Sequence, residues 1–327
     1  MTWLSVHGKN FLRHSRMPLL RINGTEIGAT PFPVRGRRLY VDSAYGAAGG
    51  AGESIYSPLS TLQAAIDRLD SLGSQEDNTG ATIVVMPNHA ETVTGASGLT
   101  FDVPGLSVIG LGNYNQRPRF LMDGGTTVTG VISAADVTLS NLEFASGHSN
   151  VATCLGVTGV GARLDRLKFG NNTTNEDFLV CITATGADNT ADGLEVTDCE
   201  WNTVDTDDDQ MISFIGSAKD VRIMRNRMMS LSTATAQLII SATGKILTNA
   251  EIGWNIHQNR MTQDELFISN DGTTNTGFVH NNYCGHADVT GAHDPGWTTG
   301  GWRLFNNLSV SVDTLQGVVV PAADVDL

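Results

Sequence analysis

The chain carries a recurring eight-residue pattern whose third position is always aliphatic. The octets begin at residues 106, 137, 162, 194, 221, 250, 277 and 302, at intervals of 25 to 32 residues. Between them lies a second short apolar segment, as at 130–136, 180–186 and 211–217. Each repeat is therefore two or three short strands separated by turns, with no room for a long helix. The aliphatic residues are Val108, Leu139, Leu164, Val196, Ile223, Ile252, Val279 and Leu304.

A repeat of this kind cannot bury its apolar side alone, whereas stacked repeats bury a continuous core. We therefore predict an all-β fold, a single-stranded parallel β-helix of about eight coils stacked roughly 4.8 Å apart. A β-sandwich is the alternative. It would need Asn-Gly or Asp-Gly hairpins every 8–12 residues or so, and such turns are scarce in this chain.

The sixth octet position changes character along the chain. It is apolar in the first four octets and asparagine in the last four. Asparagine tolerates the left-handed backbone of a sharp corner, and stacked amides hydrogen-bond along the axis. We predict a structural asparagine ladder, with a polar binding row as the alternative. Its members are Asn226, Asn255, Asn282 and Asn307.

A helix is predicted ahead of the coils, over residues 57–69. Pro58 stands in its first turn, and Leu59, Leu62, Ile66 and Leu69 share one face. An open β-helix end exposes unpaired backbone and apolar side chains. We expect this helix to cap that end.

Several segments resemble a known group. Residues 39–43, the Gly-rich stretch to Gly52 and residues 57–66 (SPLSTLQAAI) resemble the opening motif of pectate-lyase-like right-handed parallel β-helix proteins. Residues 81–87 (ATIVVMP) resemble their first coil strand, and residues 88–93 (NHAETV) resemble a variant in phage-encoded members. The resemblance covers residues 39 to about 310. It implies a right-handed helix and, for the phage members, a homotrimer of side-by-side β-helices attached to the particle by a small N-terminal segment.

The predicted organisation has four parts. Residues 1–38 form a basic extended docking arm, and 39–80 the initial strand and capping helix. The parallel β-helix spans 81–316, and 317–327 form a C-terminal tail.

The composition limits the cellular locations that we expect for the protein. No apolar run approaches the 18 or so residues of a membrane span, and the first residues lack the apolar core of a Sec signal. The four cysteines form no CxxC pair, which favours buried free thiols over a zinc cluster. We expect assembly in a reducing host cytoplasm and location in a virion, without Sec secretion.

Charge is unevenly distributed along the chain. Residues 1–38 have seven basic residues against Glu26, a balance of +6, on a chain whose net charge is −14. This favours docking on an acidic partner, the major capsid protein or another virion protein. A nucleic acid partner and a merely solvated leader are the alternatives. The predicted docking residues are Lys9, Arg13, Arg16, Arg21, Arg35, Arg37 and Arg38.

The densest acidic stretch falls between an octet and the next apolar segment. It contains Asp205, Asp207, Asp208 and Asp209. Adjacent carboxylates repel and are most comfortable in solvent or with a cation. We interpret the stretch as a solvated turn, with a Ca²⁺ site or an inter-subunit contact as the next interpretation and a catalytic role as the last. No other cofactor is predicted.

The fifth octet position offers a second candidate. Asp198 is flanked one coil to either side by Arg166 and Arg225, which predicts a stacked ion-pair ladder or, as the alternative, a lyase-type Asp/Arg site. A loop with His286, Asp288, His293 and Asp294 could hold a divalent metal or could simply be a turn. Trp297 and Trp302 could stack on sugars, or pack a trimer interface or the last coils.

No acidic column emerges at the fourth or fifth position, so no catalytic residue is assigned. The first hypothesis is a non-enzymatic phage structural protein, either a trimeric head decoration protein or a short capsid- or tail-attached spike. The second is a tailspike-type polysaccharide depolymerase, a lyase or glycosidase acting on a host surface glycan. A secreted plant-polymer lyase is weakened by the missing signal.

Overall fold

The structure is a computed structural model. It describes residues 20–22, 25–27, 36–71, 80–171, 173, 175–184, 186–202, 210–230, 239–241, 244–259, 268–270, 274–286, 301–311 and 318–320. Within these residues the chain winds into a right-handed parallel β-helix, so the predicted fold class is confirmed.

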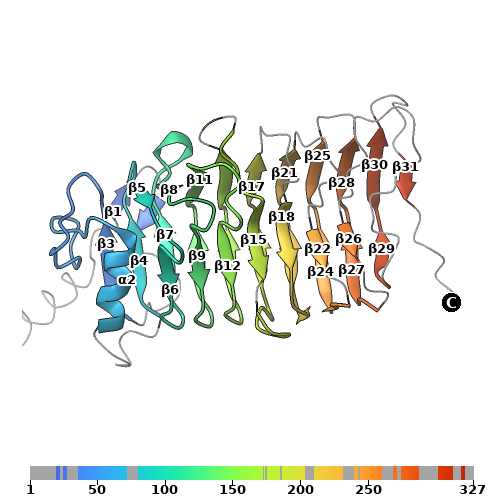
Figure 1. The fold of residues 1–327 in the computed structure, drawn as a ribbon, viewed down its shortest axis with the longest axis horizontal. Helices are drawn as coiled ribbons and strands as arrows, with labels where there is room; N and C mark the ends of the chain where they lie inside the picture. Colours follow the sequence, from blue (N-terminus) through green and yellow to red (C-terminus); the bar gives the residue numbers. More distant parts are fainter. Residues whose placement is uncertain are drawn as a thin grey trace, which may run out of the picture.

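Three long sheets form the walls, and Figure 1 shows their strands in one row from the N-terminal to the C-terminal end. The first sheet contains β3 (Arg38–Val41), β4 (Thr82–Val85), β7 (Ser107–Gly110), β10 (Thr138–Ser140), β13 (Arg163–Asp165), β16 (Glu195–Thr197), β20 (Arg222–Met224), β24 (Ala250–Gly253), β27 (Gly277–His280) and β29 (Arg303–Phe305). The second contains β5 (Ala90–Val93), β8 (Arg119–Met122), β11 (Glu143–Ser146), β14 (Lys168–Asn171), β17 (Glu200–Asn202), β21 (Arg227–Ser230), β25 (Ile256–Asn259), β28 (Tyr283–His286), β30 (Asn307–Ser311) and the antiparallel β31 (Val318–Val320). The third contains β6 (Leu99–Phe101), β9 (Gly130–Ile132), β12 (Leu155–Val157), β15 (Val180–Ala184), β18 (Gln210–Phe214), β22 (Ile239–Ser241) and β26 (Ile268–Asn270).

The octets stack in register. Leu139 pairs with Val108 on one side and with Leu164 on the other, and all eight third-position residues are buried. Each octet supplies one first-sheet strand, and β3 and β4 precede them. Among the described residues seven coils carry all three strands, so the coil count differs slightly from the predicted eight. We name each coil by its first-sheet strand.

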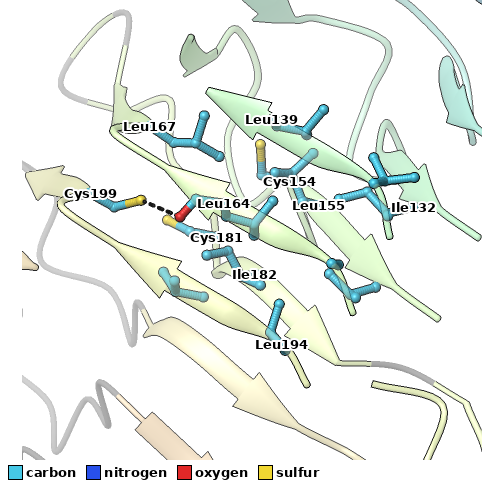
Figure 2. Packing of buried hydrophobic residues seen from close by; sticks show 14 of the residues in the cluster. Ile132, Leu139, Cys154, Leu155, Leu164, Leu167, Cys181, Ile182, Leu194 and Cys199 are labelled. Carbon is cyan, nitrogen blue, oxygen red and sulfur yellow. Dashed lines mark hydrogen bonds between the residues drawn. The ribbon is translucent and has the colours of Figure 1, made fainter. Parts of the chain in front are cut away.

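Aromatic and aliphatic side chains fill the interior. Phe144 lies between Phe120 and Phe169, with ring centroids 5.6 and 6.0 Å apart. Figure 2 shows three of the four cysteines among the aliphatic core residues, and all four are buried thiols outside any disulfide, as predicted. Burial raises the pKa of the Cys199 thiol to about 12 and that of Cys154 well above its ordinary value. These thiols therefore behave as apolar core groups.

The capping helix starts later than predicted. Helix α2 (Leu62–Ser71) begins at Leu62, because Leu59 is held in extended pairing by the backbone of Tyr40 and Asp42. The Glu91 carboxylate accepts a hydrogen bond from the Leu62 N–H at 2.8 Å, which satisfies an end group of the helix. Its apolar face is buried against β3 and β6 at the N-terminal end of the row (Figure 1).

Two of the predicted arm residues belong to the coils. Arg38 is the first residue of β3, and the Arg37 guanidinium lies 3.0 Å from Glu53. Upstream, β1 (Leu20–Ile22) and β2 (Thr25–Ile27) form an antiparallel pair. The remaining elements are the parallel pair β19 (Ala218–Lys219) and β23 (Leu247–Thr248), and the 3₁₀ turn η1 (Tyr114–Gln116). In the part of the chain that the structure describes, no helix is long and apolar enough to cross a membrane.

Candidate interaction surface

Three octet positions, the second, fifth and seventh, place their side chains on the outside of the coils, at one corner and on the two sheets beside it. In the β13, β16 and β20 coils each position carries a charge, and the sign is uniform within a coil. At these three positions the β13 and β20 coils are positive and the β16 coil is negative, while the fourth position of the β13 octet adds the carboxylate of Asp165. Because strands alternate inside and outside residues, these charges line up as three columns along the rod. The residues are Arg163, Arg166 and Lys168, then Glu195, Asp198 and Glu200, then Arg222, Arg225 and Arg227.

The second-position column is an ion-pair ladder on the first sheet. Glu195 lies 3.5 Å from Arg163 and 3.8 Å from Arg222, and Arg222 continues to Glu251 at 3.4 Å. On the second sheet, Glu143 contacts Arg119 at 3.7 Å and Lys168 at 3.2 Å. Partly exposed pairs of this kind contribute little singly, and more as a network.

The fifth-position ladder forms only in part as predicted. Arg225 binds both oxygens of Asp198, at 2.7 to 3.1 Å, and this hydrogen bonding raises the pKa of Arg225. Arg166 instead turns to its neighbour Asp165, 2.8 Å away, and donates to Ser140. Asp198 is thus paired with one arginine of the two that the sequence placed beside it.

The corner itself is built at the fifth position and not at the sixth. The fifth-position residues of the last seven octets all have positive φ, from 51° at Arg166 to 59° at Trp254. The sixth-position asparagines are buried and face inward. Our assignment of the left-handed corner to those asparagines was therefore wrong, because the turn needs its left-handed residue one position earlier.

The asparagines form a continuous ladder inside the corner. In three successive steps the Oδ1 atom of one asparagine accepts hydrogen bonds from the backbone N–H and the Nδ2 of the previous one, at 2.9 to 3.1 Å. Each Nδ2 also donates to a carbonyl of an earlier coil. The ladder provides hydrogen-bond partners for buried polar groups and holds the backbone of the corner from its inner side.

The outer columns lose most of their charges from the β24 coil onward: at the second, fifth and seventh positions of the β24, β27 and β29 coils, only Glu251 and Arg303 are charged. On the first sheet and its corner, Trp254, Phe278 and Phe305 are 56%, 40% and 41% exposed. On the second sheet, Ile256 and Tyr283 are 48% and 38% exposed, and Leu308 continues their column. We call the first group the first-sheet patch and the second group the second-sheet patch. Exposed apolar groups gathered in this way mark binding surfaces.

A stacked arrangement orders the first-sheet patch. The His280 ring lies parallel to Phe305, with centroids 4.8 Å apart and planes 2° apart, and its edge faces Trp254 at 6.5 Å. The Asn281 amide donates to His280 Nδ1 at 2.9 Å, so Nε2 carries the proton and faces Glu251, 3.4 Å away. A Cβ atom on Gly253 would lie 2.5 Å from the His280 ring, so glycine there leaves room for it.

Two hollows accompany the ladders. One of about 500 Å³ lies along the second-position column, between Arg163 and Phe278. The other, of about 780 Å³, lies over Arg119, Glu143 and Lys168, with Tyr114 at its rim. The arginines and glutamates on the wall of the first hollow pair with one another, and in the second hollow Arg119, Glu143 and Lys168 do so.

The other predicted sites fall largely outside the described residues. This holds for the acidic stretch at 205–209, for residues 287–300 with most of the His/Asp loop and Trp297, and for the docking arginines and lysine before residue 36 except Arg21, which lies in β1. Trp302 is 9% exposed and packs in the core. Among the described residues, no three His, Cys, Asp or Glu side chains gather as a metal site. Ca²⁺ at the acidic stretch stays a prediction.

Sequence inspection missed the second and seventh positions. Their signal is present in the octets, as ARLDRLKF, LEVTDCEW and VRIMRNRM alternate in sign while GFVHNNYC is uncharged. Inspection of the fourth and fifth positions alone did not reveal it.

No protein-family model matches the chain, and no curated protein matches it. Among solved structures, the chain is similar to the GH136 lacto-N-biosidase from Eubacterium ramulus, with 11% identity and a TM-score of 0.51. The match covers 84% of this chain and 64% of that one, so this chain spans less than two thirds of its length. The pectate lyase Pel9A matches at 12% identity and a TM-score of 0.42, over 89% of this chain and 82% of that one. At these identities the similarity concerns the β-helix fold alone.

Proposed function

We propose that the chain is a non-enzymatic structural protein of a bacteriophage particle, either a head decoration protein or a short capsid- or tail-attached spike. In this proposal it is a homotrimer docked by its basic N-terminal segment. The proposal rests on the pairing of charged side chains on the outside of the β-helix.

The supporting observation is that two outward carboxylates of the β16 coil, Glu195 and Asp198, already have cationic partners. Glu195 lies between two arginines, and Asp198 is held by both donors of Arg225. A glycosidase acid must reach its substrate directly, and these two carboxylates already lie against arginine guanidinium groups. These carboxylates are suited to holding neighbouring coils together.

The docking part of the proposal rests on charge. The first 38 residues carry a balance of +6, on a chain of net charge −14. An acidic surface of the major capsid protein or of another virion protein would attract the segment, whereas the acidic body disfavours nucleic acid. Arg37 is already paired with Glu53, so docking falls to the basic residues before it.

A polysaccharide depolymerase is the second candidate, because of the 500 Å³ hollow. Glu195 and Glu251 stand two coils apart on its wall, about 9.6 Å at the usual strand spacing, and Phe278 lies at its end. Inverting glycosidases place their two carboxyls about 6.5–9.5 Å apart. The lacto-N-biosidase similarity is consistent with this reading through its fold alone.

Two experiments separate the candidates. The full chain is incubated with host capsular and pectic polymers, and reducing ends and unsaturated uronates are measured. We expect no product above a blank; product that Glu195→Gln abolishes would establish the second candidate.

The docking segment is tested by deletion of residues 1–35, which stops short of the Arg37–Glu53 pair. The truncated chain should keep the circular dichroism spectrum and melting temperature of the full chain, yet fail to attach to particles. Normal attachment would refute the docking role.

A further inference from the structure

We infer that copies of this chain associate side by side through the β24, β27 and β29 coils, with the first-sheet patch of one copy against the second-sheet patch of the next. The inference rests on the proposed homotrimer and names the surface that would form it.

The position of the two patches carries the inference. Both lie on the same coils, because Phe278 and Tyr283 belong to one octet and flank one corner. A two-fold interface uses one patch twice, whereas a closed ring uses two different patches on each copy. Two apolar patches at one height along the rod, on either side of a convex corner, are the arrangement that a closed ring requires. Trp254 at the corner would point toward its axis.

The first-sheet patch is already ordered for contact. His280 is stacked on Phe305 and hydrogen-bonded on both ring nitrogens, and Arg303 lies 6.0 Å from the centre of the Phe278 ring. Side chains fixed before binding lose little entropy on association. Aromatic residues in such positions are typical anchors of interfaces.

The charges explain why contact would be confined to these coils. In parallel copies at equal height, the first sheet of one faces the second sheet of the next. Arg163 would then face Lys168, Glu195 would face Glu200, and Arg222 would face Arg227. Like charges so placed repel. In the β27 coil the same positions are Phe278 and Tyr283, which attract. In the β24 and β29 coils Glu251 would face Ile256 and Arg303 would face Leu308, so no like charges meet there.

A bound glycan is the competing occupant of the aromatic rings. It would explain the first-sheet patch, with polar groups beside the rings, but not the second-sheet patch of Ile256, Tyr283 and Leu308. A second copy accounts for both. Three coils give a small contact, so we expect association in the micromolar range.

The test is sedimentation equilibrium of the full chain from about 1 to about 100 µM. We expect a concentration-dependent trimer. Phe278→Glu and Tyr283→Lys should each weaken association at least about ten-fold, the loss expected for an interface anchor. Tyr56→Glu, at a tyrosine 92% exposed and remote from the patches, is the matched control and should change nothing.

The double variant Phe278→Glu with Tyr283→Lys discriminates further. Across the proposed contact the two new charges meet and should restore association, whereas a two-fold contact of like patches would stay broken. Wild-type chain that remains monomeric throughout, single variants that associate normally, or a double variant that stays dissociated would each overturn the inference. A monomeric chain found on particles would overturn this inference and the proposed homotrimer but keep the virion role, whereas a trimer absent from particles would overturn the virion role alone.

Discussion

The Oδ1 atom of Asn255 accepts two hydrogen bonds from Asn226, one from its backbone N–H at 2.9 Å and one from its Nδ2 at 3.0 Å. Asn255 in turn donates to Asn282 and to the Ile223 carbonyl. One fully buried amide thus joins three coils, those of β20, β24 and β27.

Asn255→Ala should destabilise the chain by about 2–4 kcal/mol, because it removes the buried acceptor of the Asn226 backbone N–H and Nδ2 and the donor to the buried Ile223 carbonyl. Urea unfolding followed by circular dichroism measures the change. The exposed Asn115→Ala is the control and should stay within about 0.5 kcal/mol of wild type. A loss below about 1 kcal/mol at Asn255 would contradict the structural role of the ladder.

Trp254 occupies a left-handed corner, with φ of 59°, where the next two coils have asparagine. Because a bulky residue is costly there and asparagine is tolerated, Trp254→Asn should stabilise the isolated chain by about 1 kcal/mol. The comparison is made in the Phe278→Glu background, so that association does not contribute. The same substitution should weaken association of the wild-type chain. A Trp254→Asn chain that is less stable would show that the indole serves the fold rather than an interface.

Glu195→Lys would place a cation between Arg163 and Arg222, and so make three successive residues of the second-position column positive. We expect a destabilisation of about 1–2 kcal/mol at low salt, smaller at high salt because the ladder is partly exposed and screened. Thermal melts at two ionic strengths measure it. Asp123→Lys, a charge reversal outside the ladders, should have less effect. Equal losses of stability from Glu195→Lys and Asp123→Lys would mean that the alternation of charge sign along the ladder does not stabilise the fold.

The Cys199 thiol has an ordinary pKa of 9.0 and a folded pKa of about 12. Above pH 9 the unfolded chain loses this proton while the folded chain keeps it, so stability falls as pH rises. The contribution of the Cys199 thiol to the free energy of unfolding is full below pH 9. It decreases by about 1.4 kcal/mol per pH unit until the folded pKa is reached. Denaturant unfolding of wild type and Cys199→Ala from pH 8 to pH 11 measures it. The free energy of unfolding of wild type relative to Cys199→Ala should fall by this amount for each pH unit above pH 9. If the two plots of unfolding free energy against pH run parallel, the raised pKa is contradicted.

The repeat was predictable because each octet must bury the same aliphatic position, as Leu139 and Leu164 illustrate by pairing in register. The first residue of the capping helix and the ion-pair partner of Arg166 could not be predicted from the sequence. Leu59 is drawn into strand pairing by a backbone far from it in sequence, and Arg166 had two acids within reach. Such choices depend on neighbours that spacing alone does not place.

The corner and the patches illustrate a different limit. Which octet position takes the left-handed backbone depends on where the turn falls, and polar residues stood at both the fifth and the sixth. The sign pattern of the outer columns was readable in the octets. Its meaning became clear only when Phe278 and Tyr283 were found at one height on two faces.

The proposed phage role is tested most directly by cryo-electron microscopy of purified particles, with peptide mass spectrometry of the same sample. We predict stoichiometric peptides of the chain and a three-fold density of rods on the head or tail. Their C-terminal coils should be in contact, and the β13 to β20 coils apart. Particles without the chain, together with glycan cleavage by the free protein, would contradict the account.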